Sequence, residues 1–133
     1  MADTLTSQTI QDGEKTAILK FTNESDGTGE ASVKKVDVSA LASNSAGKAC
    51  SSVSISRIYW ACRGMGVDIE FDATTNVLAI PLPADSTGDE YYDLFTGIPN
   101  NAGSGVTGDI DFTTVGHSNG DAYSIILVLT KNF

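Results

Sequence analysis

The segment that most constrains the fold is the apolar run Ala122–Thr130. Its apolar residues occupy both parities of a strand, with Ile126 and Val128 on one and Leu127 and Leu129 on the other. Alternate residues of a strand point to opposite faces of a sheet, so both faces of this strand are apolar. Such a strand is either central and buried on both sides, or it leaves one face for a partner subunit.

The rest of the chain divides into short segments with β pattern, separated by glycine-containing turns. Period-2 alternation predicts strands at 15–22, 33–38, 51–62, 67–72, 77–82 and 109–114. A change of parity within 51–62 predicts a β-bulge near Ser56 and Arg57. Pro81 lacks a backbone donor and places its strand at a sheet edge or strand end. Residues 83–90 and 97–108 are expected to be loops.

Length and composition place these strands in one domain. The chain has 133 residues, 41% of them hydrophobic and 19% charged, as is usual for a globular domain with its own core. Short strands with glycine turns predict an all-β fold, a single antiparallel β-sandwich of jelly-roll-like form over residues 15–133. Residues 1–14 are polar and are expected to form a flexible or extended N-terminal arm, with one β-like stretch at 8–11.

Negative charge is concentrated in the second half of the chain. Residues 1–63 carry seven basic and seven acidic groups, whereas residues 64–133 carry ten acidic groups and only Lys131. A nucleic-acid partner is not expected, because it requires a basic footprint. An anionic membrane surface is not expected for the same reason. The acidic half suits a basic protein surface or a cation, or it serves solubility alone.

Two groups of carboxylates could carry chemistry. Asp68, Glu70 and Asp72 alternate with core residues on one predicted strand, and Asp109 and Asp111 repeat the pattern on another. Neighbours on one strand face lie roughly 7 Å apart, a spacing that glycosidases also use. If the two strands were adjacent, the five carboxylates could bind Ca²⁺. The sequence favours solvated strand faces over either role.

Other candidate residues point to no reaction. Cys50, Cys62 and His117 do not have the spacing of a zinc site, and buried thiols are favoured over a disulfide. His117 lies in a polar turn without a nucleophile elbow, and the glycine loop 103–108 lacks the ending of a phosphate-binding loop. No catalytic, cofactor-binding or metal-ligating residue is therefore assigned, no cofactor is expected, and the chain is not expected to be an enzyme.

Aromatic side chains leave one binding alternative open. Trp60, Tyr91 and Tyr92 could stack against a sugar, as in a carbohydrate-binding module. Trp60 shares strand parity with Ile58 and Cys62, which favours a place in the core.

Several segments taken in order resemble small virion structural proteins of tailed bacteriophages, notably those of marine and cyanobacterial hosts. They are residues 36–41 (VDVSAL), 54–60 (SISRIYW), 67–73 (VDIEFDA), 97–103 (GIPNNAG), 107–114 (TGDIDFTT) and 123–127 (YSIIL). Together they span roughly residues 33–130, and none of them is a catalytic signature.

The resemblance implies a non-enzymatic β-sandwich that acts as a capsid decoration or cement protein. Such a protein binds the lattice of the phage major capsid protein on the outside of the head, often as a trimer, after assembly in the host cytoplasm. A tail or head–tail connector component is the alternative within the virion. Residues 1–14 fall outside the resemblance, and as an extended arm they could add a strand to a neighbour.

Overall fold

The structure, a computed structural model, describes residues 4–91 and 97–133. Nine strands are present in these residues: β1 (Thr4–Asp12), β2 (Thr16–Glu24), β3 (Val33–Val36), β4 (Ser52–Arg63), β5 (Gly66–Phe71), β6 (Val77–Leu82), β7 (Thr87–Tyr91), β8 (Ile110–Val115) and β9 (Ala122–Asn132). A short 3₁₀ helix, η1 (Val38–Ala40), follows β3. No helix in this part of the chain has the length and apolar character needed to span a membrane.

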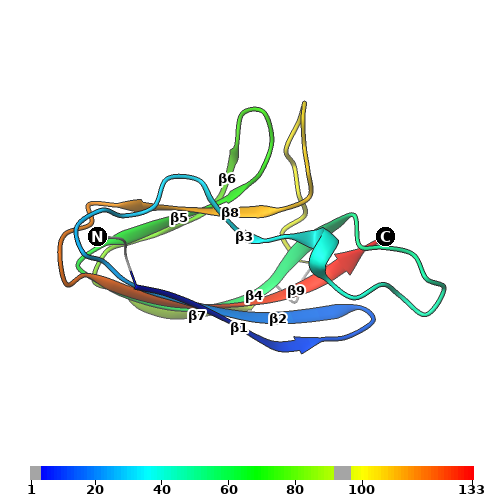
Figure 1. The fold of residues 1–133 in the computed structure, drawn as a ribbon, viewed down its shortest axis with the longest axis horizontal. Coiled ribbons are helices and arrows are strands. Elements are labelled where there is room, and N and C mark those ends of the chain that lie inside the picture. Colours follow the sequence, from blue (N-terminus) through cyan, green and yellow to red (C-terminus); the bar gives the residue numbers. More distant parts are fainter. Residues whose placement is uncertain (1–3, 92–96) are drawn as a thin grey trace.

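The strands form two antiparallel sheets that pack face to face. The five-stranded sheet has the order β1-β2-β9-β4-β7, and the four-stranded sheet has the order β3-β8-β5-β6. Figure 1 shows them as two layers, with β3, β5 and β8 in the upper layer and β1, β2, β4, β7 and β9 in the lower one. The predicted all-β antiparallel sandwich is confirmed.

The connectivity follows one nested pattern. Strands β2 and β9 pair, as do β3 and β8, β4 and β7, and β5 and β6, and every pair is antiparallel. The chain from β2 to β9 is thus arranged as one long hairpin that is wrapped into two sheets. Strand β1 lies outside this pattern and extends the five-stranded sheet beyond β2.

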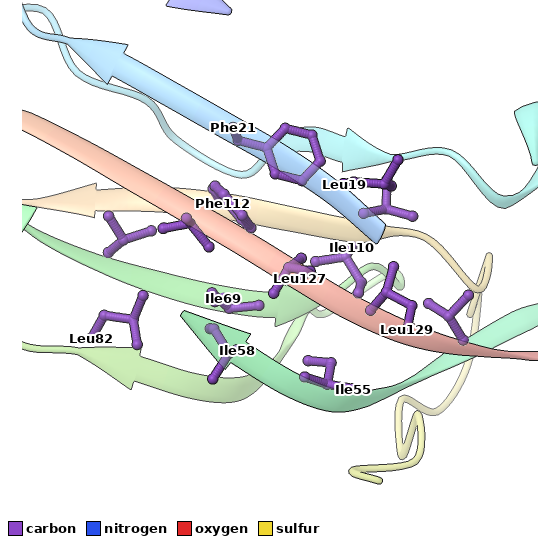
Figure 2. Packing of buried hydrophobic residues seen from close by; sticks show 14 of the residues in the cluster. Leu19, Phe21, Ile55, Ile58, Ile69, Leu82, Ile110, Phe112, Leu127 and Leu129 are labelled. Carbon is purple, nitrogen blue, oxygen red and sulfur yellow. The ribbon is translucent and has the colours of Figure 1, made fainter. Parts of the chain in front are cut away.

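Apolar side chains from both sheets fill the space between them (Figure 2). Val67, Ile69 and Phe71 of β5 are fully buried there, as their alternation predicts. At one end of the core the Phe112 ring makes edge-to-face contacts with Phe21, at 5.4 Å between centroids, and with Tyr123, at 5.9 Å. Aromatic pairs prefer this geometry, and each contact adds roughly 0.5–1.5 kcal/mol beyond the buried area.

Three local predictions agree with the strand register. The β4–β9 register shifts between Ile55 and Arg57, which is the predicted bulge. The turn at 74–76 between the alternating segments 67–72 and 77–82 predicts a hairpin, which β5 and β6 form, and Pro81 lies in β6 at the edge of its sheet as expected. The bulge turns the second half of β4 so that Ile58 points into the core, as Ile55 does.

The prediction that residues 83–90 form only a loop is wrong, because Thr87–Tyr91 forms β7 and pairs with β4. The sequence TGDEY has no apolar alternation, since β7 lies at a sheet edge and is mostly exposed. Gly88 lies against the Trp60 ring, where a Cβ atom would approach to 2.4 Å. The sequence also predicts a short aromatic strand or turn at 91–96, of which residues 92–96 lie outside the described residues.

The N-terminal segment forms a strand over most of its length. Residues 4–12 pair with β2, so the β-like stretch at 8–11 is part of a longer edge strand. The end of β1 is tied down by Lys131, whose ammonium group is buried and bonds to the Asp12 carboxylate and to the carbonyl oxygens of Gly13, at 2.5 Å, and Ala42, at 3.0 Å. The one basic residue of the second half is therefore structural.

Candidate functional site

The outer face of the five-stranded sheet is the candidate site. Strand β9 buries Tyr123, Ile125, Leu127 and Leu129 in the core, and its alternate residues point away from it. Within the described residues no further layer covers those alternate side chains. Of the two arrangements that the apolar β9 sequence allows, the single chain lacks the one in which both faces are covered, because the outer face of β9 is left open within the described residues.

Strand register places apolar, aromatic and basic side chains in two adjacent rows across this face. One row crosses four strands through Ile18, Val128, Arg57 and Tyr91, and the next row contains Lys20, Ile126, Tyr59 and Asp89. We call the six residues Ile18, Arg57, Tyr59, Tyr91, Ile126 and Val128 the outer-face cluster. They line a common hollow of about 350 Å³.

Arg57 is the centre of the cluster. Its guanidinium carbon lies 4.6 Å from the centroid of the Tyr59 ring and 5.2 Å from that of Tyr91. The guanidinium also makes a two-point hydrogen bond with Asp89, at 3.0 Å from Nε to Oδ1 and 2.8 Å from Nη2 to Oδ2. Ring stacking and a planar fork fix the orientation of the guanidinium in a way that lysine cannot reproduce.

The Arg57–Asp89 ion pair shifts the pKa of both of its members. The hydrogen bond from Arg57 lowers the pKa of the Asp89 carboxyl, and the same bond raises the pKa of Arg57. Both groups stay charged at neutral pH and nearly cancel each other. The face therefore presents apolar and aromatic surface around a neutralised ion pair, and this surface is easier to desolvate than one with isolated charges.

This arrangement suits contact with a protein. Protein interfaces are enriched in Tyr and Arg, which also dominate their binding energy. A sugar-binding platform instead requires an open aromatic face, and here Arg57 covers Tyr59 and Tyr91. Trp60 is half-buried against the core and donates its ring N–H to Ser86 Oγ at 3.0 Å. Tyr92, the third candidate for stacking, lies outside the described residues.

The predicted carboxylate strands are neighbours, because β5 pairs with β8 and Glu70 lies opposite Asp111. The expectation that both groups are solvated strand faces is wrong for β8. Asp109 and Asp111 are 4% and 3% exposed, whereas Asp68, Glu70 and Asp72 are partly exposed. The segments around Asn76 and Thr107 fold over Asp111 and Asp72, and burial by such loops is not visible in strand alternation.

Hydrogen bonds tie Asp111 and Asp72 to the loops. Asn76 Nδ2 donates to Asp111 at 3.0 Å, and Thr107 Oγ1 donates to Asp72 at 2.7 Å. Burial and the neighbouring Asp72 carboxyl raise the pKa of Asp111 to about 6. The hydrogen bond from Thr107 lowers the pKa of Asp72.

The acids do not form a metal centre. Among residues 4–91 and 97–133, no three His, Cys, Asp or Glu side chains converge closely enough to hold a metal ion. The nearby Lys34 ammonium group forms a salt bridge with Asp109 at 2.9 Å. This contact raises the pKa of Lys34.

The remaining candidates lie apart from one another. His117 Nδ1 is 3.1 Å from Thr114 Oγ1, and its ring packs against Gly29. Cys50 and Cys62 are buried free thiols, and burial raises the pKa of Cys62 to about 11. In the glycine loop, Gly108 has φ +87° and a Cβ there would lie 2.1 Å from the Ser51 carbonyl oxygen, so glycine serves close packing.

A scan against models of known protein families finds no match to this chain, and a search among curated proteins finds none either. The resemblance to phage virion proteins therefore stays a prediction from the sequence. Function has to be argued from the surfaces of the molecule.

Proposed function

We propose that this chain is a non-enzymatic virion structural protein of a tailed bacteriophage. It binds the lattice of the major capsid protein from outside the head and stabilises the head as a decoration or cement protein. The observation that carries the proposal is the outer-face cluster, an apolar and aromatic surface on a central strand that the chain itself leaves uncovered. A stable soluble domain gains nothing from such a surface unless a partner covers it.

The nested strand pairing supports a further part of the proposal, that β2 to β9 form a jelly roll. Viral capsid proteins are one of the classes built on this architecture, and lectins are another. The architecture is therefore compatible with a capsid protein and with a lectin, and it does not distinguish between them. The outer-face cluster favours the protein-binding class, because Arg57 occupies the ring faces that a sugar would use.

Binding energy in such a contact comes from a few anchors. Tyr91 is 60% exposed, and Asp89 holds the Arg57 guanidinium in one orientation. Both side chains therefore lose little conformational freedom when a partner covers them. The partner surface that fits is apolar, with polar groups at its rim. A homo-oligomer, with the trimer that the resemblance implies, is part of the same proposal.

The test is co-sedimentation of the purified protein with phage heads that have been stripped of it. Saturable binding at a fixed ratio to the major capsid protein is the expected result, and the ratio identifies the lattice position. Failure to bind heads, with the protein present in whole particles, moves it to the tail or the connector. Absence from particles overturns the virion assignment altogether.

A further inference from the structure

A second interaction surface emerges when the edges of the two sheets are compared. An edge strand presents unpaired backbone N–H and C=O groups, and proteins usually protect it with short length, charged side chains, proline or a bulge. Four of the described strands lie at sheet edges: β3 and β6 in one sheet, and β1 and β7 in the other. Their protection is very unequal.

Three of these edges carry the usual devices. Strand β3 has only four residues, two of which are Lys34 and Lys35. Strand β6 contains Pro81, and the β5–β6 register is shifted next to Ile69. Strand β7 has five residues and includes Asp89 and Glu90.

The edge of β1 is different. It has nine residues, TLTSQTIQD, with no proline and no basic residue, and its only charge is the terminal Asp12. A bulge lies between Thr9 and Gln11, so the regular stretch ends at Thr9. Residues 5–11 are all exposed, including Leu5 at 46% and Ile10 at 50%. The regular stretch is long enough for a strand pair of ordinary size.

We propose that the free edge of β1 pairs with β1 of a second copy of this chain. An antiparallel pair of identical strands is two-fold symmetric, so each copy contributes the same surface. The segment tolerates itself as a partner, because no charged side chain lies between residues 5 and 9 to meet a like charge. The two five-stranded sheets then become one continuous sheet.

The pair also gains side-chain contacts, because a hollow lies beside β1 on the surface of the single chain. Leu5, Thr6 and Ser7 of β1 line this hollow together with Phe21 of β2 and with Val33, Lys34 and Lys35 of β3. In a pair centred on Ser7, Thr9 of the second copy lies opposite Leu5. The second strand therefore covers an apolar side chain that the single chain leaves exposed.

This inference does not depend on head binding. It predicts a two-fold pair, whereas the resemblance implies a trimer, so the mass of the free protein distinguishes the two. A protein that pairs through β1 and fails to bind heads would support this inference and overturn the proposed function. A protein that binds heads but does not pair through β1 would overturn this inference and support the proposed function.

The experiment compares the full-length chain with Ser7→Lys and, as a matched control, Ser104→Lys. Ser7→Lys places two lysines opposite each other at the centre of the pair, while Ser104 is exposed in the loop that precedes β8 of the other sheet. Sedimentation equilibrium from micromolar to millimolar protein is expected to give a monomer–dimer equilibrium for the wild type and for Ser104→Lys. The Ser7→Lys dimer is expected to be about tenfold weaker.

Hydrogen exchange supplies a readout that a dimer formed elsewhere would not change. In the monomer, the β1 amides that point away from β2 exchange quickly, and in the paired strand they are protected as concentration rises. A wild type that stays monomeric over the whole range overturns the inference. So does a dimer in which these amides remain unprotected, and so does protection that arises only on stripped heads, since a strand of the head would then be the occupant.

Discussion

The outer faces of the two sheets differ in how their charged side chains are arranged. On the five-stranded sheet, Arg57 and Asp89 neutralise each other among aromatic and aliphatic side chains. On the four-stranded sheet, Glu70, Asp72 and Asp111 crowd together, and Lys34 of β3 lies opposite Asp111 in the register. The first face has little hydration to lose on contact, whereas on the second Asp111 is buried beneath loops and the partly exposed Glu70 and Asp72 keep part of their hydration.

This difference indicates which side of the sandwich is built for contact and which for solvent. A desolvated interface tolerates paired charges and penalises unpaired ones. The acidic excess of the chain, a net charge of −9, lies largely in the second half, which contributes four acids, Asp68, Glu70, Asp72 and Asp111, to the four-stranded face. An oriented binder with one contact face and one acidic solvent face fits the proposed place on the outside of a head.

The largest expected effect comes from the buried cation of the five-stranded sheet. Replacing Lys131 by methionine removes the ion-pair partner of Asp12 and the donor to the carbonyl oxygens of Gly13 and Ala42. Removing one partner of such a pair is expected to lower the free energy of unfolding by about 3 kcal/mol. Urea unfolding measures this loss, and Lys20→Met on the outer face of the same sheet is the control, with a change within about 0.5 kcal/mol. Equal effects of the two substitutions would show that Lys131 does not anchor β1.

The acidic face is expected to show the next largest effect, as a pH dependence. The raised pKa of Asp111 means that the folded chain holds more protons than the unfolded chain between about pH 4 and pH 6. Stability from this group therefore falls as pH rises through that window. Asp111→Asn removes the buried charge beside Asp72 and is expected to stabilise the fold at pH 8 by roughly 1–3 kcal/mol.

Thermal unfolding from pH 4 to pH 8 checks this prediction. The wild type should lose stability relative to Asp111→Asn as the pH rises. Asp68→Asn removes a charge from the same face without changing Asp72 or Asp111, and its profile should follow that of the wild type. Parallel profiles for wild type and Asp111→Asn would refute the role given to this pair.

The smallest expected effect on stability belongs to the contact face. Arg57→Lys keeps the charge and removes the planar fork and the ring stacking. Because the Arg57–Asp89 pair is partly exposed, the free energy of unfolding should change by less than about 1 kcal/mol. Binding to stripped heads should weaken by about tenfold, since the guanidinium positions both tyrosine rings. A loss of stability without a loss of binding would make Arg57 merely structural.

Sequence pattern predicts those features of the fold that depend on neighbours along the chain. The parity change before Arg57 reveals the β4 bulge, and the alternation of Val67, Ile69 and Phe71 reveals the inner face of β5. Hydrophobic alternation does not predict strand β7, because this polar edge strand is held by backbone pairing with β4 and not by a buried face.

The candidate site could be predicted only in part. The apolar residues on both parities of β9 indicate that one face is open, and Ile126 and Val128 follow from that. Arg57, Tyr59 and Asp89 come together only through the β4–β7 register, which the sequence does not specify. Asp111 is buried by distant loops, so its unusual titration has no local signal.

The most direct test of the contact face compares two equivalent substitutions on opposite sides of the sandwich. Ile126→Lys places a charge in the outer-face cluster, and Leu78→Lys places the same charge at an exposed apolar residue opposite Glu70 on the four-stranded sheet. Binding of each folded variant to stripped heads is measured by co-sedimentation. The account predicts that Ile126→Lys weakens binding at least about tenfold and that Leu78→Lys binds like the wild type. Wild-type binding by Ile126→Lys, or an equal loss in Leu78→Lys, would contradict it.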